Sequence, residues 1–400
     1  MNTIKSLEVF SGAGGLATGL WECGASHSAL VEWNNHACNT LIANHGWDVV
    51  HNADASKFDF SKYDVDIVAG GPPCQPFSLA GKHQGSMDTR DMFPHACRAI
   101  SECAPKAFIF ENVKGLLRKS FSSYFEYILL RLSYPEIIKK ENENWEDHLR
   151  RLERHHTSGS KSGLCYRVVF RLVDAADYGV PQRRERVVIV GIREDLGVEW
   201  SFPKPTYSFE SLIWDQFVGG EYWNRHDVKK PDTSCYDQRI SELIQKAEKQ
   251  HGFFPPELKP WKTVRDQLAD IPEPDVEGSF SPEHVIRNGA RSYPGHTGSF
   301  IDLPSKTLKA GDHGVPGGEN MIRFHDGSVR YFTTYEAKRI QTFPKNYKIT
   351  GSWTEGMRQV GNAVPVRLGR VVGKSVIESV WRKTECTTRR WGHQLTPQLT

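Results

Sequence analysis

The chain has 400 residues, of which 38% are hydrophobic and 25% are charged, which is ordinary for a soluble globular protein with a sizeable core. No segment approaches the roughly 20 apolar residues that span a bilayer. The segment Met1–Phe10 lacks the apolar region of a signal peptide. We therefore expect a cytoplasmic protein that does not associate with a membrane and is long enough for two domains.

The charge balance and the cysteine spacing limit the kinds of partner and site that the chain can have. Lys plus Arg number 51 and Asp plus Glu number 48, a formal charge of +3. A nucleic-acid partner would therefore require basic residues clustered on one face, because the whole-chain charge would not attract it. The eight cysteines form no C-x-x-C pair. Their scatter argues against a disulfide framework and against a structural zinc site, and we expect no metal.

Short apolar runs alternate with helix-length segments through the first half of the chain. This rhythm predicts an α/β fold, with a mostly parallel sheet covered by helices on both faces. The predicted strands are Leu7–Phe10, Ala29–Glu32, Val65–Ala69, Ala107–Phe110, Tyr166–Val173 and Arg186–Gly191.

The rhythm changes twice further along the chain. The highly charged segment Pro135–His156 predicts a surface helix, and Ser158–Gly163 predicts a loop. Residues 203–330 are rich in Pro, Gly, Trp and His, which predicts a second, irregular domain with short strands. Helical patterns return at Thr334–Gln341 and Pro365–Trp381.

A glycine-rich turn follows the first predicted strand. Ser11-Gly12-Ala13-Gly14-Gly15-Leu16 leads from that strand into a helix, an arrangement that lets a cofactor approach the backbone. About 20 residues later Glu32 ends the second strand, where a carboxylate suits ribose hydroxyls. The turn is neither G-x-G-x-x-G nor a P-loop. An adenosine cofactor without pyrophosphate is therefore favoured over a dinucleotide or a nucleoside triphosphate.

A cysteine stands at the end of the third predicted strand. The strand enters Gly70-Gly71-Pro72-Pro73-Cys74-Gln75-Pro76-Phe77-Ser78, in which three prolines stiffen the backbone around Cys74. The carboxyl end of a strand is where α/β folds place their ligands. A lone cysteine would otherwise be a small buried hydrophobe.

The segment Gly71–Ser78 resembles the nucleophile motif of the cytosine-5 DNA methyltransferases, which include bacterial modification enzymes. Further blocks of that family occur in its order over residues 7–192 and 330–366. These blocks are Phe10–Leu16, Glu32-Trp33, Asp54, Phe110–Val113, Tyr178–Arg186, Arg330–Phe343 and Gln359–Val364. The pair Thr307-Leu308 resembles the Thr-Leu pair of the family's recognition domain.

The resemblance implies a Rossmann-like S-adenosylmethionine-dependent methyltransferase sheet with a smaller target-recognition domain. The reaction would methylate C5 of a flipped-out cytosine through a bond between Cys74 and C6, and would release S-adenosylhomocysteine. The implied catalytic residues are Cys74, Glu111 and Arg184. The implied cofactor contacts are Phe10, Ser11, Gly12, Gly14, Gly15, Leu16, Glu32, Trp33, Asp54, Pro73, Asn362 and Val364. The implied DNA contacts are Gln75, Ser78, Arg186 and Thr307.

Two further roles follow from the resemblance. Asn112 is expected to support the proline segment, and Arg186 is expected to pair with a carboxylate or with the DNA backbone. The catalytic domain should comprise residues 1–204 and 350–400, and the recognition domain residues 205–349. Double-stranded DNA is the expected partner of a monomeric enzyme that works beside a cognate restriction endonuclease.

The sequence departs from the family pattern at two places. Thr89-Arg90-Asp91-Met92-Phe93 lacks the glycine of the family's T-R-G-x-L-F block, and the insertion near 135–160 is longer than in minimal members. Three alternatives remain at this point. They are an RNA methyltransferase of the same chemistry, a non-catalytic DNA-binding protein, and a nucleotide-dependent oxidoreductase.

Overall fold

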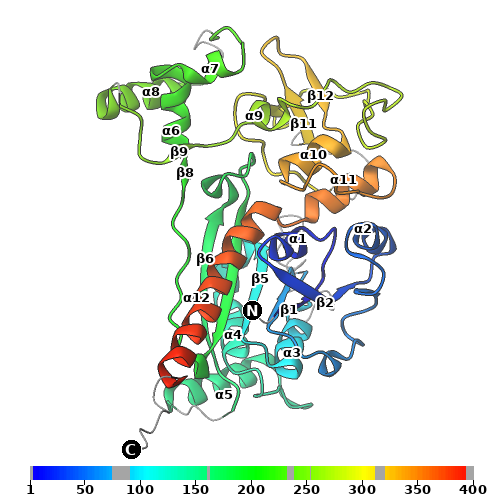
Figure 1. The fold of residues 1–400 in the computed structure, drawn as a ribbon, viewed down its shortest axis with the longest axis vertical. Helices are drawn as coiled ribbons and strands as arrows, with labels where there is room; N and C mark the ends of the chain where they lie inside the picture. Colours follow the sequence, from blue (N-terminus) through cyan, green and yellow to red (C-terminus); the bar gives the residue numbers. More distant parts are fainter. Residues whose placement is uncertain are drawn as a thin grey trace, which may run out of the picture.

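The computed structural model describes residues 3–73, 91–159, 163–231, 238–252, 254–310 and 320–392. Two lobes are evident in Figure 1, with a sheet and its helices below and a lobe of short strands and helices above. Within the described residues, no helix is both long enough and apolar enough to cross a membrane.

The lower lobe is built on a seven-stranded sheet of order β3-β2-β1-β4-β5-β7-β6 among the described residues. Its strands are β1 (Ile4–Val9), β2 (Ala25–Glu32), β3 (Val50–Asn52), β4 (Ile67–Gly70), β5 (Ala107–Val113), β6 (Tyr166–Asp174) and β7 (Glu185–Arg193). Only β7 runs antiparallel to its neighbours, so the predicted mostly parallel sheet is confirmed. All six predicted strands are present. The sequence interpretation missed β3, a strand of three residues.

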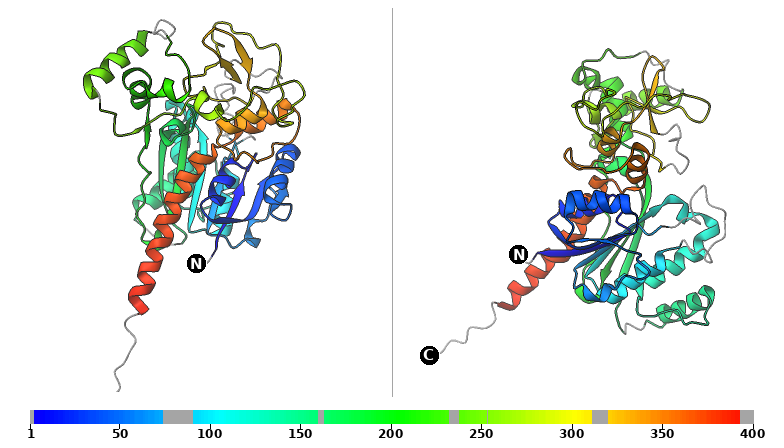
Figure 2. Two further views of the ribbon diagram at one scale, coloured as in Figure 1. Left: turned by 45° about the horizontal axis from the view of Figure 1, so that its top comes forward. Right: turned by 90° about the vertical axis from the view of Figure 1, so that its right-hand side faces the viewer.

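Helices cover both faces of the sheet, as predicted (Figure 2). One face carries α1 (Gly15–Trp21), α2 (Asn35–His45) and α12 (Val366–Gly392), and the other carries α3 (Phe93–Cys103), α4 (Ser122–Ser133) and α5 (Trp145–Thr157). The alternation of strand side chains explains this division. Leu7 and Val9 of β1 pack with α3 and α4, whereas Ile67 and Ala69 of β4 pack with α1 and α12. Helix α5 is the surface helix expected in the charged insertion.

The upper lobe contains the expected short strands and also helices that were not predicted. The strands are β8 (Tyr207–Ser208), β9 (Lys259–Pro260), β10 (Ser299–Phe300), β11 (Met321–Arg323) and β12 (Val329–Tyr331). The helices are α6 (Phe209–Ile213), α7 (Glu221–Arg225), α8 (Gln238–His251), α9 (Val264–Leu268), α10 (Thr334–Ile340) and α11 (Trp353–Asn362). Of these, only α10 was predicted, and four of the others lie in the segment expected to be irregular. Helices as short as five residues leave little periodic signal in a sequence.

The C-terminal helix α12 packs against the N-terminal part of the chain. Helix α12 packs along α1, and a Cβ atom on Gly19 would lie 2.6 Å from the Arg370 nitrogen and 2.7 Å from the Val366 oxygen. The preceding helix α11 shares a hydrophobic cluster with α10 and with Ala13 of the glycine turn. We propose the division into 1–204 with 350–400 and 205–349 as a description of the two lobes, with α11 at their junction.

The contact between α1 and α12 can be tested with one added methyl group. Gly19→Ala should lower the free energy of unfolding by about 1–3 kcal/mol, because the new Cβ would meet backbone atoms that cannot rotate away. Gly373→Ala is the matched control on the same interface, since its Cβ would meet only the Cδ2 tip of Leu20 at 2.7 Å. Urea unfolding measures both variants. Equal stability of the two would contradict the proposed close approach.

Candidate active site

The glycine turn joins β1 to α1 in a conformation that requires glycine. Gly14 has a φ of +78°, and its N–H donates to the Ser11 carbonyl at 2.8 Å. A Cβ atom on Gly15 would lie 2.1 Å from the Val364 carbonyl oxygen, so the segment before α12 covers the start of α1. Leu16 is buried directly below. The sequence alone predicted this turn, and the contact with Val364 explains one of its glycines.

Glu32 holds the glycine turn from the end of β2. Its Oε2 accepts the Gly12 N–H at 2.8 Å, and its Oε1 accepts the N–H groups of Trp33 and Asn34 at 3.0 and 2.9 Å. Its carboxylate is 9% exposed. The three donors fix the carboxylate beside the turn, where a ligand resting on the glycines would meet it.

Two further predicted cofactor residues lie at the same edge of the sheet. The Trp33 side chain is 78% exposed. Asp54 follows β3, and the Ala53 N–H donates to the Glu32 carbonyl at 2.9 Å, which joins the two loops. Hydrogen bonds from Ser56 lower the pKa of Asp54, so this exposed carboxylate is charged. Glu32 therefore contacts the glycine turn, and the exposed Trp33 and Asp54 follow the strands β2 and β3 at the same edge of the sheet.

A buried polar layer supports the turn from below. The Tyr347 hydroxyl donates to the Ala13 carbonyl at 2.6 Å, and it reaches the turn from the segment after α10. Burial, and next the charge of Glu32, raises the pKa of Glu8. Burial also lowers the pKa values of His27 and His45 to about 4, which keeps both imidazoles neutral near pH 7. The layer thus supports the turn without adding charge.

The proline segment is described as far as Pro73, while Cys74, Gln75 and Ser78 lie outside the described residues, as do Thr89 and Arg90. The Asn112 Nδ2 donates to the Pro72 carbonyl at 2.9 Å, which confirms the supporting role predicted for this side chain. Its Oδ1 accepts the Val113 N–H at 2.9 Å. The strand β5 therefore fixes the backbone two residues before Cys74.

Glu111 lies one residue before Asn112 and forms an ion pair with Arg186 across β5 and β7. The Arg186 Nε lies 2.7 Å from the Glu111 Oε1, and the side chains are 12% and 11% exposed. A Cβ atom on Gly71 would lie 3.6 Å from the Glu111 Oε2, so the carboxylate faces the start of the proline segment. The expectation that Arg186 pairs with a carboxylate is confirmed.

The Arg184 side chain is buried where the two lobes meet. Its side chain is 1% exposed, and its Nη1 and Nη2 donate to the carbonyls of Leu308 and Gly361 at 3.2 and 2.8 Å. Burial, and next the charge of Arg186, lowers its pKa. Both of its terminal nitrogens bond inside the protein, and the contact of Arg184 with the flipped base or its phosphate stays a prediction. Arg184 is a positioning residue that ties the two lobes together.

Buried side chains beside Arg184 complete this connection. Gln182 accepts the Leu308 N–H at 3.1 Å and donates to Gln341 at 3.1 Å, and Gln341 donates to the carbonyls of Val360 and Ala363 at 2.7 and 3.1 Å. We call Gln182, Arg184 and Gln341 the polar seam. Gln182 and Gln341 are fully buried.

Two predicted contact residues border the polar seam. The Thr307 hydroxyl donates to the Arg183 carbonyl at 2.7 Å, so in this structure it faces the protein backbone. Asn362 is exposed at the end of α11, two residues before Val364.

The sequence interpretation missed a residue that holds the Asp54 loop. Arg98 of α3 donates from Nη2 to the carbonyls of Ala55 and Phe58 at 2.7 and 2.8 Å, and from Nη1 to Glu102 at 2.7 Å. Its guanidinium also lies over the Phe60 ring. An Arg and a Glu four residues apart on a helix look like an ordinary surface pair in a sequence, so no signal identified this role.

The chain matches one family model, described as C-5 cytosine-specific DNA methylase, over residues 4–134 and 141–378. It is 33% identical to the Type II methyltransferase M.Eco47II of Escherichia coli over 383 residues, which cover 94% of this chain and 79% of that protein. It is 32% identical to the Type II methyltransferase M.PspPI of Psychrobacter sp. (strain TA137) over 379 residues, which cover 93% of this chain and 78% of that protein.

Two solved structures share the fold. The S. pombe Dnmt2 methyltransferase matches with a TM-score of 0.53 and 16% identity, covering 94% of this chain and 98% of that one. The Entamoeba histolytica methyltransferase EhMeth matches with a TM-score of 0.54 and 14% identity, covering 96% and 99%. At these identities the likeness concerns the fold alone.

The structural role of Arg184 gives a stability prediction. Arg184→Met should lower the free energy of unfolding by about 2–5 kcal/mol, because two buried carbonyls lose their donors. Arg183→Met is the matched control, since that side chain is 59% exposed and its pair with Asp174 should be worth less than about 1 kcal/mol. Denaturant unfolding measures both changes. An Arg184→Met protein as stable as Arg183→Met would overturn the structural role.

Proposed function

The chain belongs to the C-5 cytosine-specific DNA methylase family, and on that premise we propose that it methylates C5 of a flipped-out cytosine in a specific short sequence of duplex DNA. The observation that carries this proposal is the Glu111–Arg186 pair beside Gly71, at the start of the segment that leads to Cys74. A base stacked inside a duplex cannot reach a recessed carboxylate, so the cytosine must leave the helix.

The cofactor we propose is S-adenosylmethionine, which supplies an electrophilic methyl group when bound. The glycine turn fits this group, because a Cβ atom on Gly12 would meet nothing within 4 Å and the Glu32 carboxylate accepts the Gly12 N–H. We assign Glu32 to the ribose hydroxyls and Asp54 to the adenine amino group. The remaining proposed contacts are Phe10, Ser11, Gly14, Gly15, Leu16, Pro73, Asn362 and Val364.

The protein's own groups would activate the cytosine. The Cys74 thiolate adds to C6, and the ring then becomes an enamine whose C5 is nucleophilic. As the thiolate adds, a protonated Glu111 carboxyl would donate its proton to ring N3, and Arg186 holds the Glu111 carboxyl in place. Once C5 carries the methyl group, the C5 proton passes to a water molecule, and β-elimination breaks the bond between Cys74 and C6 and restores the thiolate. The N3 proton then returns to Glu111. We assign Gln75, Ser78 and Thr307 to DNA contacts.

We also propose that the enzyme acts as a monomer and serves as the modification partner of a restriction endonuclease, because its curated relatives near 33% identity are Type II methyltransferases. Transfer of radiolabel from S-adenosylmethionine to duplex DNA, with tRNA as the comparison, tests the substrate. Label on tRNA but not on duplex DNA would contradict the proposal.

The covalent step can be trapped. A duplex with 5-fluorocytosine at the target should form a stable adduct that requires S-adenosylmethionine, because fluorine cannot leave C5 as the proton does. Cys74→Ser should abolish the adduct and slow methylation by at least about a thousandfold, since a hydroxyl is a far weaker nucleophile. Denaturing gel electrophoresis detects the adduct. A Cys74→Ser protein that methylates DNA at the wild-type rate would refute the mechanism.

The role of Glu32 can be tested by direct binding. Glu32→Ala should weaken S-adenosylmethionine binding by about tenfold or more, because it removes an acceptor for the cofactor and for the glycine turn. The affinity of Glu32→Gln for S-adenosylmethionine should lie between that of Glu32→Ala and that of the wild type, because glutamine keeps one acceptor oxygen. Glu126→Ala, an exposed change on α4, is the control. Calorimetry measures all three. Unchanged affinity in Glu32→Ala would remove this residue from the site.

A further inference from the structure

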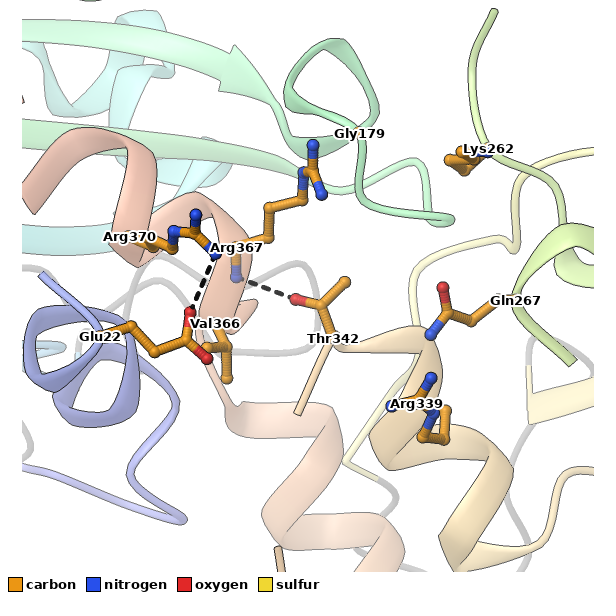
Figure 3. Close-up of a pocket in the computed structure, with 9 residues that line it drawn as sticks. All are labelled: Glu22, Gly179, Lys262, Gln267, Arg339, Thr342, Val366, Arg367 and Arg370. Carbon is orange, nitrogen blue, oxygen red and sulfur yellow. Dashed lines mark hydrogen bonds and ion pairs between the residues drawn. The ribbon is translucent and has the colours of Figure 1, made fainter. Parts of the chain in front are cut away.

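A pocket lies where the two lobes meet, and its lining includes none of the residues assigned to the active site above (Figure 3). Its volume is about 230 Å³. The lower lobe contributes Glu22 after α1, residues of α12 and the turn at Gly179, and the upper lobe contributes residues in or near α9 and α10. The pocket is therefore formed only when the lobes are in contact.

The lining is strongly basic. Four cations surround the pocket, two from each lobe, namely Lys262, Arg339, Arg367 and Arg370. Glu22 is the single acid of the lining, and it lies 3.5 Å from Arg370. Asp270, whose pKa is lowered by Lys345 and also by the charge of Arg339, is paired with Lys345. Positive charge thus exceeds negative charge at a contact between lobes, where like charges repel.

Hydrogen bonds to the protein hold Arg367 and Arg339 in place and leave some of their N–H donors unused. Arg367 donates from Nε to the Tyr178 carbonyl at 2.7 Å and from Nη2 to the Tyr207 hydroxyl at 2.9 Å. Arg339 donates from Nη1 to the Phe343 carbonyl at 3.3 Å, and its Nε is buried without a hydrogen-bond partner among the described residues. A buried N–H of a cation without an acceptor is costly, so this position favours an added acceptor.

The backbone between α10 and α12 fixes these side chains relative to one another. Thr342 has a φ of +62°, which is unfavourable for a β-branched residue. Its hydroxyl accepts a hydrogen bond from the backbone N–H of Arg367 at 2.9 Å, as the dashed line in Figure 3 marks. The strained residue therefore sets the first turn of α12 against the end of α10 and keeps Arg339 and Arg367 on one pocket.

We propose that this pocket binds a phosphate group, held between Arg339 and Lys262 on one lobe and Arg367 and Arg370 on the other. Guanidinium groups donate in pairs to phosphate oxygens, and an anion between the lobes offsets the repulsion of their cations. A bound phosphate should therefore strengthen the contact between the lobes. The phosphate can belong to a free anion or to the DNA backbone, and the proposal does not depend on methyl transfer.

Calorimetry and thermal unfolding of the full chain test the site, with inorganic phosphate as the probe and chloride at equal ionic strength as the reference. Phosphate should bind saturably and raise the Tm, whereas chloride should do neither. Arg339→Gln and Lys262→Gln should each weaken phosphate binding at least tenfold. Lys262 has no hydrogen bond or ion pair among the described contacts, so its replacement should leave the fold intact. Lys348→Gln, an exposed change outside the pocket, should bind phosphate like the wild type.

Duplex DNA distinguishes the two sources of phosphate. If the backbone occupies the pocket, Lys262→Gln should reduce the slope of log affinity against log salt by about one, and inorganic phosphate should compete with DNA. If a free anion occupies it, the DNA affinity and the slope should stay unchanged while phosphate binding is lost. Either result supports the site. No saturable phosphate binding, or equal binding in Lys262→Gln and the wild type, would overturn the proposal.

Discussion

The relative position of the two lobes depends on one physical constraint: polar groups that are buried away from water need hydrogen-bond partners. The Leu308 segment and the end of α11 both present backbone carbonyls or N–H groups to the same buried space. Gln182, Arg184 and Gln341 satisfy them with side chains that are themselves almost fully buried. A hydrocarbon side chain at any of the three positions would leave a buried donor or acceptor unpaired. The polar seam therefore fixes the relative position of the lobes more specifically than hydrophobic packing could.

The candidate active site uses the same principle with carboxylates. Glu111 and Glu32 each end a strand or lie near its end, and each is nearly buried because basic or N–H groups surround it. Parallel strands bring their carboxyl ends to one edge, so groups separated by about 80 residues face one region of the molecule. The polar seam then holds the upper lobe against the lower lobe.

The upper lobe is also held together by a buried polar side chain. The Asp302 carboxylate is fully buried and accepts hydrogen bonds from Tyr222 and Arg265, and it also contacts His325. These partners come from α7, α9 and the hairpin of β11 and β12. Short strands and helices bury little apolar surface individually, so a shared buried acid helps to hold them in one arrangement.

The sequence by itself determined the elements whose cause is local. Apolar runs gave the six main strands, the spacing of glycines gave the turn at Gly12–Gly15, and the motif around Cys74 indicated the chemistry and the family. The resemblance predicted a carboxylate or the DNA backbone as the partner of Arg186 but did not identify Glu111, and nothing in the sequence indicated that Arg184 is buried. Only the tertiary structure decided that Arg186 pairs with Glu111 and that Arg184 is buried between Leu308 and Gly361. It also decided that Tyr347 supports the glycine turn and that cations from residues 262–370 line one pocket. The physical reason is that burial and ion pairing depend on which distant segments meet, and no short window of sequence contains both partners.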